Sequence, residues 1–266
     1  MARDNHTYAG GGADRPDGRT YRPDDRRSAL AASRRDVLRT IGAGALLGSI
    51  GTARVQAAPG DREFVATDGP EFTVGGEPIY FSGTNNFWVT DPYSDRSRID
   101  DVLALCADLD QNLLRTWAFC AGEGGQCLQP EPGVFNEAAL QHLDYLVAKA
   151  GEHGVRLILS LVNNWDDYGG MAQYIEWADG ASEHGDFYVN EACRELYRTH
   201  VETLLTRENS ITGVEYRNDP AIAMWELANE PRLEDDDTET IDDREAALTE
   251  WFADMSGFIK DFDDNH

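Results

Sequence analysis

The sequence contains very little lysine and few basic residues of any kind. Of its 266 residues, only Lys149 and Lys260 are lysines. Residues 1–60 hold 10 of the 23 basic residues and 6 of the 49 acidic ones, which leaves 13 basic and 43 acidic residues and a net charge of −30 in the remainder. Because phosphate binding requires clustered Lys and Arg, this scarcity argues against nucleic acid as a partner.

The acidic excess also has a consequence for the solvent in which the chain can fold. Like charges at this density repel one another and destabilise a compact chain in dilute buffer, whereas 1 M salt screens them within about 3 Å. We therefore expect a protein adapted to high salt. The alternative, an acidic domain from an organism that lives at ordinary salt, stays open.

Long apolar runs are also missing. The weakly apolar span 41–51 is too short to cross a bilayer as a helix. The pair Arg34-Arg35 precedes this span, and an A-x-A-like end lies near Ala57. This order predicts a twin-arginine signal within a disordered N-terminus, residues 1–57, and therefore a secreted, extracellular protein. The alternative is a disordered basic N-terminus without a signal.

Cysteine is scarce, and the cysteines lack the spacing of a metal site. The four are Cys106, Cys120, Cys127 and Cys193. A loop disulfide between Cys120 and Cys127 is compatible with an extracellular location, but the spacing alone leaves the pairing open.

What the sequence does contain is a repeated order of short apolar runs and amphipathic helical patterns. Four runs predict strands, over residues 77–88, 113–119, 155–165 and 221–230. Each run is followed by apolar residues at helical spacing, over 99–109, 140–150, 189–204 and 248–262. Before them, residues 64–79 alternate around two glycine turns, which predicts a small β-hairpin at the bottom of the fold.

Four strand–helix units in succession indicate parallel β/α architecture, either a barrel or a doubly wound sheet. The glycine fingerprint of a dinucleotide-binding sheet is absent after the first strand. Instead, polar and aromatic residues gather at the carboxyl ends of the strands, where (β/α)8 barrels carry their active sites. The sequence therefore predicts an α/β fold of the TIM-barrel family.

A complete barrel needs eight such units, and the four present already use residues 77–266. A whole barrel of this kind would need roughly 350 residues or more. Half a barrel leaves two apolar edge strands open, which invites aggregation. We therefore expect a truncated chain, with residues 58–266 forming the first half of a catalytic domain.

The stretch MWELANEP places Asn229 and Glu230 at the end of the fourth predicted strand. A carboxyl group in a partly apolar cleft near another anion stays protonated and can act as a general acid. The amide of Asn229 can donate to a sugar hydroxyl beside the bond to be cleaved. The structural alternative is a strand end that caps the next segment.

Arg115 and Trp117 lie two residues apart on one predicted strand and so face the same side. If that side is the barrel interior, Arg115 needs a carboxylate partner and Trp117 offers a flat apolar wall to a sugar ring. The partner of Arg115 is either the nucleophile of the reaction or Glu226, which would make a structural ion pair.

Several loop residues could also belong to a site. As a cluster, the loop aromatics could line a polysaccharide groove, although each alone is more often local packing; they are Trp88, Trp165, Tyr168, Tyr174 and Trp177. Asp166 and Asp167 could act as the base of an inverting mechanism, but adjacent loop aspartates are usually solvated turn residues.

At these residues the sequence resembles the endo-β-1,4-mannanases of glycoside hydrolase family 5, especially the plant and fungal type. The matching stretches include FSGTNNFW, LLRTWAF, LVNNWDDYGG and AIAMWELANEPR, and together they cover most of residues 64–266. The long match that runs into LVNNWDDYGG is specific to the mannanase branch. The NEP motif alone is shared with cellulases and many other barrel glycosidases.

The resemblance implies a retaining endo-hydrolase with two catalytic glutamates, no cofactor and no metal. Glu230 matches the proton donor and general acid/base, and Asn229 matches the residue that contacts the sugar at the cleavage point. Trp117 and Arg115 match a substrate-binding tryptophan and the arginine beside the nucleophile. Arg232 looks like the arginine on the leaving-group side.

In the resembling family the nucleophilic glutamate follows the seventh strand, so this chain is expected to contain no nucleophile and to be inactive alone. We expect its parent to be a secreted hydrolase that cleaves internal β-1,4-mannosidic bonds of mannan, glucomannan or galactomannan. Two alternatives stay open: a β-1,4-glucanase or cellulase of the same family, and a non-catalytic sugar-binding remnant.

Overall fold

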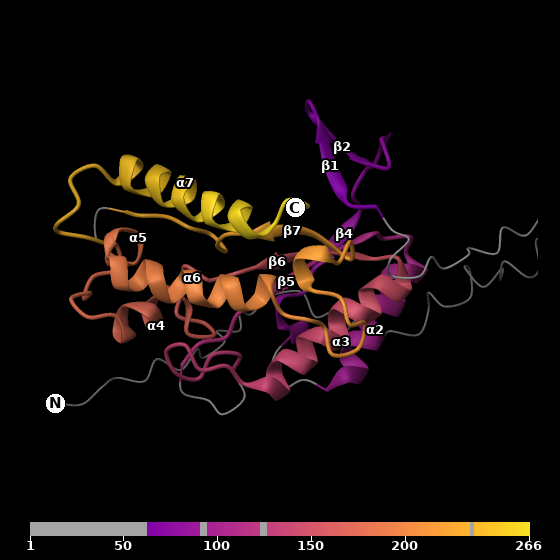
Figure 1. Cartoon of the computed structure of the whole chain (residues 1–266), viewed down its shortest axis with the longest axis horizontal. Coiled ribbons are helices and arrows are strands. Elements are labelled where there is room, and N and C mark those ends of the chain that lie inside the picture. Colours follow the sequence, from indigo (N-terminus) through magenta and orange to yellow (C-terminus); the bar gives the residue numbers. More distant parts are fainter. Residues whose placement is uncertain (1–62, 91–94, 123–126, 235–236) are drawn as a thin grey trace, which may run out of the picture. The chain divides into compact units, whose positions relative to one another are not determined.

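The computed structural model describes residues 63–90, 95–122, 127–234 and 237–266 (Figure 1). The predicted signal and the rest of the N-terminus lie outside these residues. Within them, a small hairpin is followed by four strand–helix units, as the sequence predicts. None of the helices in this part of the chain is both long and apolar enough to traverse a lipid bilayer.

The hairpin is an antiparallel sheet of β1 (Val65–Asp68), β2 (Glu71–Val74) and β3 (Glu77–Pro78). Its turns use Gly69, Gly75 and Gly76 at φ values of +59°, +64° and +78°, a region that glycine enters without steric cost. The guanidinium of Arg156 donates to the Glu63 carbonyl at 2.8 Å, which ties the hairpin to the start of a parallel strand. Most hairpin side chains are exposed in this chain.

The parallel sheet has the order β4 (Gly83–Asn85), β5 (Leu113–Trp117), β6 (Arg156–Ser160) and β7 (Ile222–Glu226). The long helices that follow these strands are α2 (Arg96–Asp108), α3 (Glu137–His153), α6 (Glu191–Leu205) and α7 (Arg244–Phe262) (Figure 1). Every strand of the parallel sheet is shorter than predicted. The first predicted strand, 77–88, is divided between β3 and β4, and the other strands end before their predicted carboxyl ends. Beyond β6 and β7, only an isolated parallel bridge between Asn163 and Asn229 continues the pairing.

Four short helical segments complete the part of the chain that the structure describes. These are η2 (Phe87–Thr90), α4 (Gly170–Trp177), α5 (Asp186–Val189) and η3 (Tyr216–Asn218). The sequence predicts a loop with surface aromatics over the α4 segment. In the structure Tyr174 is 1% exposed and so offers no ring to a groove, whereas Trp177 is half-buried and packs edge-on against it.

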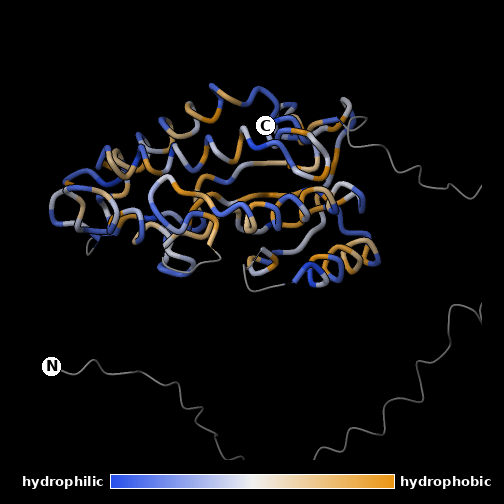
Figure 2. Tube along the Cα trace, turned by 60° about the horizontal axis from the view of Figure 1, so that its bottom comes forward, coloured by the Kyte–Doolittle hydropathy of each residue, from blue (hydrophilic) through white to orange (hydrophobic). Residues whose placement is uncertain are grey.

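The two faces of the parallel sheet have different surroundings. Side chains alternate between the faces along each strand, and the face toward the helices is fully buried at Leu114, Leu157 and Leu159. Figure 2 shows hydrophobic and hydrophilic segments alternating along the helices, as expected for helices that bury one side. The register aligns the residues of the other face in two rows: Asn85, Arg115, Ile158 and Met224, then Trp117, Ser160 and Glu226.

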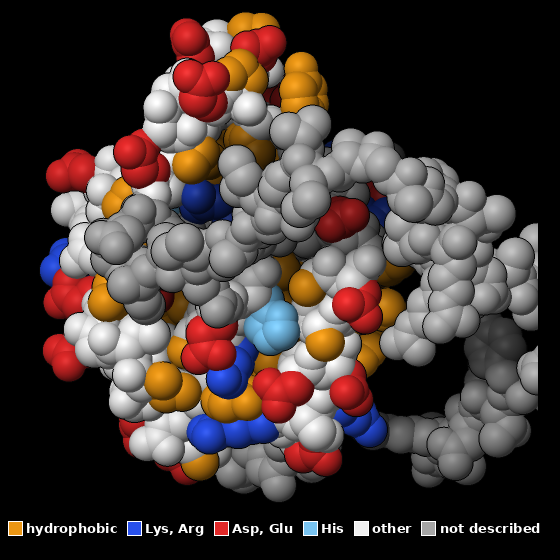
Figure 3. All heavy atoms as spheres, turned by 90° about the vertical axis from the view of Figure 1, so that its right-hand side faces the viewer, with side chains coloured by type: hydrophobic (Ala, Val, Ile, Leu, Met, Phe, Trp, Pro, Cys, Tyr) orange, Lys and Arg blue, Asp and Glu red, His pale blue; other side chains and the backbone are white. Residues whose placement is uncertain are grey.

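The surface carries many carboxylates and few cations, and Figure 3 shows acidic side chains scattered over one face. Individual arginines are therefore shared by several acids. Arg198 contacts Glu191 at 2.7 Å and Asp254 at 2.6 Å, and it also contacts Glu195. Because each such arginine offsets several negative charges at once, a small number of cations can lower the repulsion between neighbouring helices.

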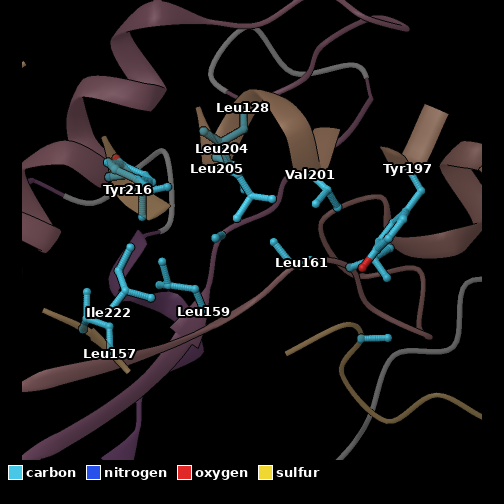
Figure 4. Packing of buried hydrophobic residues seen from close by; sticks show 14 of the residues in the cluster. Leu128, Leu157, Leu159, Leu161, Tyr197, Val201, Leu204, Leu205, Tyr216 and Ile222 are labelled. Carbon is cyan, nitrogen blue, oxygen red and sulfur yellow. The ribbon is translucent and has the colours of Figure 1, made fainter. Parts of the chain in front are cut away.

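The core lies between the parallel sheet and the helices (Figure 4). Leu157, Leu159 and Ile222 of the strands pack with Val201 and Leu204 of α6, all with no exposed surface. A second part of the same cluster is aromatic and surrounds the fully buried Trp251 of α7; its rings belong to Phe187, Tyr188, Tyr197 and Phe252. Burial of these large side chains fixes α6 and α7 on the outer face of the sheet.

A disulfide joins Cys120 and Cys127 in the loop that follows β5, which resolves the pairing that the sequence left open. Cys106 and Cys193 are buried free thiols. The disulfide closes a loop of few residues next to the carboxyl end of the sheet, so it restricts the chain close to the polar strand ends.

A buried carboxylate, Asp144 of α3, fastens the loop that follows α6. Arg207 donates to both of its oxygens, at 2.8 and 2.6 Å, and Tyr216 donates at 2.7 Å. Burial alone would raise the pKa of Asp144, but the hydrogen bonds from Arg207, Tyr216 and Ser210 outweigh it and hold the pKa below its ordinary value.

We expect Asp144→Asn to lower the free energy of unfolding by about 3 kcal/mol at pH 7, because it leaves the Arg207 charge partly buried with one acidic partner fewer. Urea unfolding in molar salt measures this difference. The folded state holds the Asp144 pKa low, so its contribution is complete above roughly pH 4 and is lost as the pH falls through the folded pKa. The gap between wild type and variant should therefore shrink at pH 3.

Glu137→Gln is the matched control, because Glu137 contacts the same arginine at 3.0 Å but its side chain is 61% exposed. An exposed pair of this kind contributes at most about 0.5 kcal/mol. Equal losses in the two variants would contradict the assignment of Asp144 as the stabilising partner.

Candidate active site

Asn229 and Glu230 follow β7 at the carboxyl end of the sheet, beside the segment that follows β6. The Asn229 amide donates to the Val162 carbonyl at 2.8 Å, and the Asn164 amide donates back to the Asn229 carbonyl at 3.0 Å. Glu230 itself has φ of +50°, a left-handed conformation that is uncommon for a residue with a side chain. The backbone is thus held by hydrogen bonds at Asn229 and strained at Glu230. Such a combination recurs at functional sites.

The carboxylate of Glu230 is exposed and accepts one hydrogen bond, from the indole Nε1 of Trp165 at 2.8 Å. Trp165 is 44% exposed and lies in the loop after β6. In the sequence, Trp165 is only one of several loop aromatics that could line a polysaccharide groove. Its contact with Glu230 joins residues 65 positions apart, so only the tertiary structure could reveal it.

Arg115 lies at the centre of the sheet face that points away from the helices, the inner face. The structure pairs it with Glu226. Its Nε and Nη2 donate to the two Glu226 oxygens at 3.1 and 2.6 Å. Nη2 also donates to the Asn229 side-chain oxygen at 2.7 Å, and Nη1 donates to Asn85 at 3.2 Å. This geometry realises the structural ion pair that the sequence allowed as an alternative, and it links β4, β5 and β7.

The side-chain amide of Asn229 is 8% exposed and is engaged at both ends. Its oxygen accepts from Arg115, and its Nδ2 donates to the Asn163 oxygen at 2.8 Å. A carboxamide nitrogen carries two hydrogens, so this arrangement uses one and leaves one for a ligand.

Trp117 does not present a flat face to solvent as the sequence analysis expected, because it is only 7% exposed. Its ring lies near-parallel to Phe119 and tilted by 34° against Phe87, with centroids 4.9 and 4.8 Å away. Tyr168 meets it edge-on at 5.1 Å. The exposed aromatic surface at this end belongs instead to Phe87, which is 41% exposed, and to Trp165.

Arg232 lies two residues beyond Glu230 and stacks on Trp165, with its guanidinium carbon 4.2 Å from the ring centroid. Its Nη1 contacts Glu234 at 3.0 Å. Three of the predicted residues, Arg115, Asn229 and Glu230, therefore adjoin one another, and Arg232 joins them through an aromatic ring that the sequence analysis did not assign to this role.

The two loop aspartates adopt the turn conformation that their sequence favours. The Gly169 amide donates to the Asp166 carbonyl at 3.0 Å, the Asn163 side chain donates to the Asp167 carbonyl, and both aspartate side chains are exposed. The described residues contain no group of three or more His, Cys, Asp or Glu side chains placed to hold a metal ion.

Comparison with known proteins places these features in a family. The sequence profile of the glycoside hydrolase family 5 β-mannosidase-like proteins matches residues 62–266. The chain is 42% identical over 211 residues to mannan endo-1,4-β-mannosidase 5 of Arabidopsis thaliana, covering 76% of this chain and 47% of that protein. The chain spans about half the length of the curated relatives that it matches.

Solved structures agree in fold. An endo-1,4-β-mannanase from Rhizomucor miehei is 36% identical with a TM-score of 0.71, covering 76% of this chain and 59% of that one. An endo-β-1,4-mannanase from Thermotoga petrophila is 41% identical with a TM-score of 0.65, covering 72% of this chain and 42% of that one. The four parallel β/α units, the strand-end Asn-Glu pair and this likeness together show that the chain belongs to glycoside hydrolase family 5, among its β-mannosidase-like members.

Proposed function

We propose that the natural polypeptide containing this chain is an endo-acting hydrolase of the internal β-1,4-mannosidic bonds of mannan, glucomannan or galactomannan. The observation that carries this proposal is the exposed carboxylate of Glu230 at the end of β7, in a chain whose relatives are named mannan endo-1,4-β-mannosidases. In this proposal residues 58–266 are the first half of the catalytic domain.

Glu230 acts as the general acid and then as the general base. In the first step it donates its proton to the oxygen of the scissile bond while a second carboxylate attacks the sugar from the opposite face. In the second step Glu230 removes a proton from the water that releases the covalent intermediate. This retaining route needs the two carboxyl groups about 5–5.5 Å apart.

Glu226 is poorly suited to be that second carboxylate. Glu226 lies four residues before Glu230, deeper in the sheet, and Arg115 engages both of its oxygens, at 3.1 and 2.6 Å, so neither oxygen is free to bond to a sugar carbon. We propose that the nucleophile belongs to the part of the family's length that this chain does not span, and that this chain alone does not hydrolyse mannan.

The remaining site residues bind the polysaccharide. The second N–H of Asn229 is the donor for a sugar hydroxyl next to the cleaved bond. Arg232 contacts the chain on the leaving-group side. Trp117 packs against Phe87 and supports its ring. Phe87 and Trp165 supply the aromatic surface on which sugar rings stack.

We expect Glu230→Gln to lower mannan hydrolysis at least about 100-fold, because a carboxamide cannot transfer the proton. The measurement is reducing-sugar release from mannan and, in parallel, from carboxymethylcellulose, with the natural polypeptide.

Asp166→Asn, which neutralises an exposed aspartate in the neighbouring loop, is the matched control and should keep close to full activity. Unchanged hydrolysis by Glu230→Gln would contradict the role of Glu230. Cleavage of the cellulose derivative alone would make the enzyme a glucanase.

We further propose that the enzyme is secreted through the twin-arginine route and works in concentrated salt. The support is the order of signal features in the N-terminal segment and the net charge of −30 in the rest of the chain. Clusters in which one arginine serves several acids, such as Arg198 and Arg194, fit the same condition.

Raising KCl from 0.1 to 2 M should increase the midpoint of thermal unfolding by about 10 °C, because screening removes several kcal/mol of self-repulsion. Differential scanning calorimetry measures this shift. NaCl at the same concentration is the control, since screening depends on ionic strength and not on which monovalent cation is present. An unfolding temperature that is independent of KCl, or that rises in KCl and not in NaCl, would speak against screening of the acidic surface.

A further inference from the structure

We propose that Trp165 is a positioning residue that gives the two oxygens of Glu230 different tasks, with Oε2 bound to the indole and Oε1 carrying the proton that is transferred. The inference deepens the proposed function and rests on it for the role of Glu230. The hydrogen bond itself is a property of the structure that can be tested without any activity.

The chemistry of the indole supports this division. The Nε1–H of tryptophan can only donate a hydrogen bond. At 2.8 Å from Oε2 of Glu230, it therefore requires a lone pair on that oxygen. When Glu230 takes up a proton, Oε1 is the favoured site, because an acid hydroxyl at Oε2 would be a weaker acceptor for the indole than a carbonyl oxygen; Oε1 is also the oxygen that the indole does not contact.

The carboxylate needs such a contact because nothing else in the described part of the chain is seen to hold it. Its side chain is exposed, and the bond from Trp165 is the one hydrogen bond found for it there. A free glutamate side chain samples several rotamers, and fixing it costs entropy that a single good hydrogen bond can offset. Without the indole, the acid would point at the scissile oxygen only part of the time.

One contact is made to the Trp165 ring, and others are made to the backbone of its loop. The Arg232 guanidinium stacks over the ring at 4.2 Å. Behind the residue, Gly170 approaches so closely that a Cβ on it would lie 1.8 Å from the Trp165 carbonyl oxygen. The Met171 amide donates to the Asn163 carbonyl at 2.8 Å and closes the same loop. The backbone that carries the indole is thus closely packed, and the ring is contacted on one face by Arg232.

The stacking also connects two positions on the leaving-group side of the bond. Arg232 and Glu230 lie two residues apart in sequence, and both contact Trp165, one through its face and one through its edge. A polysaccharide that binds Arg232 would therefore act, through the stacked guanidinium, on the Trp165 ring that orients the acid. Binding on that side and protonation of the leaving oxygen are coupled through one side chain.

The first test follows indole N–H signals by NMR in the natural polypeptide labelled with ¹⁵N-tryptophan. Trp165→Phe identifies the Trp165 signal by its loss, because phenylalanine keeps a ring for Arg232 and lacks the N–H. We expect that signal to move with pH in the wild type and to stop responding in Glu230→Gln. A Trp165 signal that is the same in wild type and Glu230→Gln would overturn the proposal.

The second test compares the kinetics of Trp165→Phe and Trp177→Phe on mannan. Trp177 lies in α4 and packs against Tyr174, so its replacement controls for the loss of an indole elsewhere. We expect Trp165→Phe to lower kcat about 10- to 100-fold with KM changed less than about threefold, and Trp177→Phe to alter neither much. An unchanged kcat in Trp165→Phe would overturn the positioning role.

The two tests separate this inference from the proposed function. If the wild type does not hydrolyse mannan, the proposed function fails, while the NMR response still decides whether Trp165 binds the Glu230 carboxylate. If the wild type is active and the Trp165 indole signal is the same in wild type and Glu230→Gln, the function stands and the inference is wrong.

Discussion

The ion pair between Arg115 and Glu226 is the interaction on which the inner face of the sheet depends. Their side chains are 22% and 31% exposed, so neither charge is fully hydrated and each requires the other. The same guanidinium reaches Asn85 and Asn229 and so connects three strands. Because Asn229 immediately precedes Glu230, the position of the acid follows from a charge pair set deeper in the sheet.

The segment after β7 illustrates how backbone strain at Glu230, the proposed acid, is supported by ordinary backbone contacts. Glu230 has a positive φ, which costs of order 1–3 kcal/mol for a residue with a side chain. Hydrogen bonds of Asn229 to Val162 and Asn164 hold the preceding residue in register with β6. The strained residue is thereby turned out of the ladder, and its carboxylate meets the loop that carries Trp165.

The sequence was sufficient for the hairpin and for four strand–helix units, because burial on one or both faces imposes periodicities that a chain displays locally. It also placed Asn229 and Glu230 at the end of one strand and Arg115 within another, and the structure brings these three residues together; their part in a reaction stays a prediction. It misjudged Tyr174 and Trp117, whose exposure depends on rings supplied by other elements. It also overlooked the pairing of Trp165 with Glu230, because a hydrogen bond across 65 positions depends on the register of two strands and leaves no local pattern.

The scarcity of cations explains why several arginines of this chain each bind more than one partner. Arg115 serves one carboxylate and two amides, Arg207 serves Asp144 and Glu137, and Arg198 serves three acids. In a protein of balanced charge, a lost arginine can be offset by a neighbouring cation. Here Arg198 and Arg207 each contact more than one carboxylate, so removal of either leaves several negative charges in mutual repulsion. Acidic composition thus makes the few arginines both the main constraint on the fold and the support of its site.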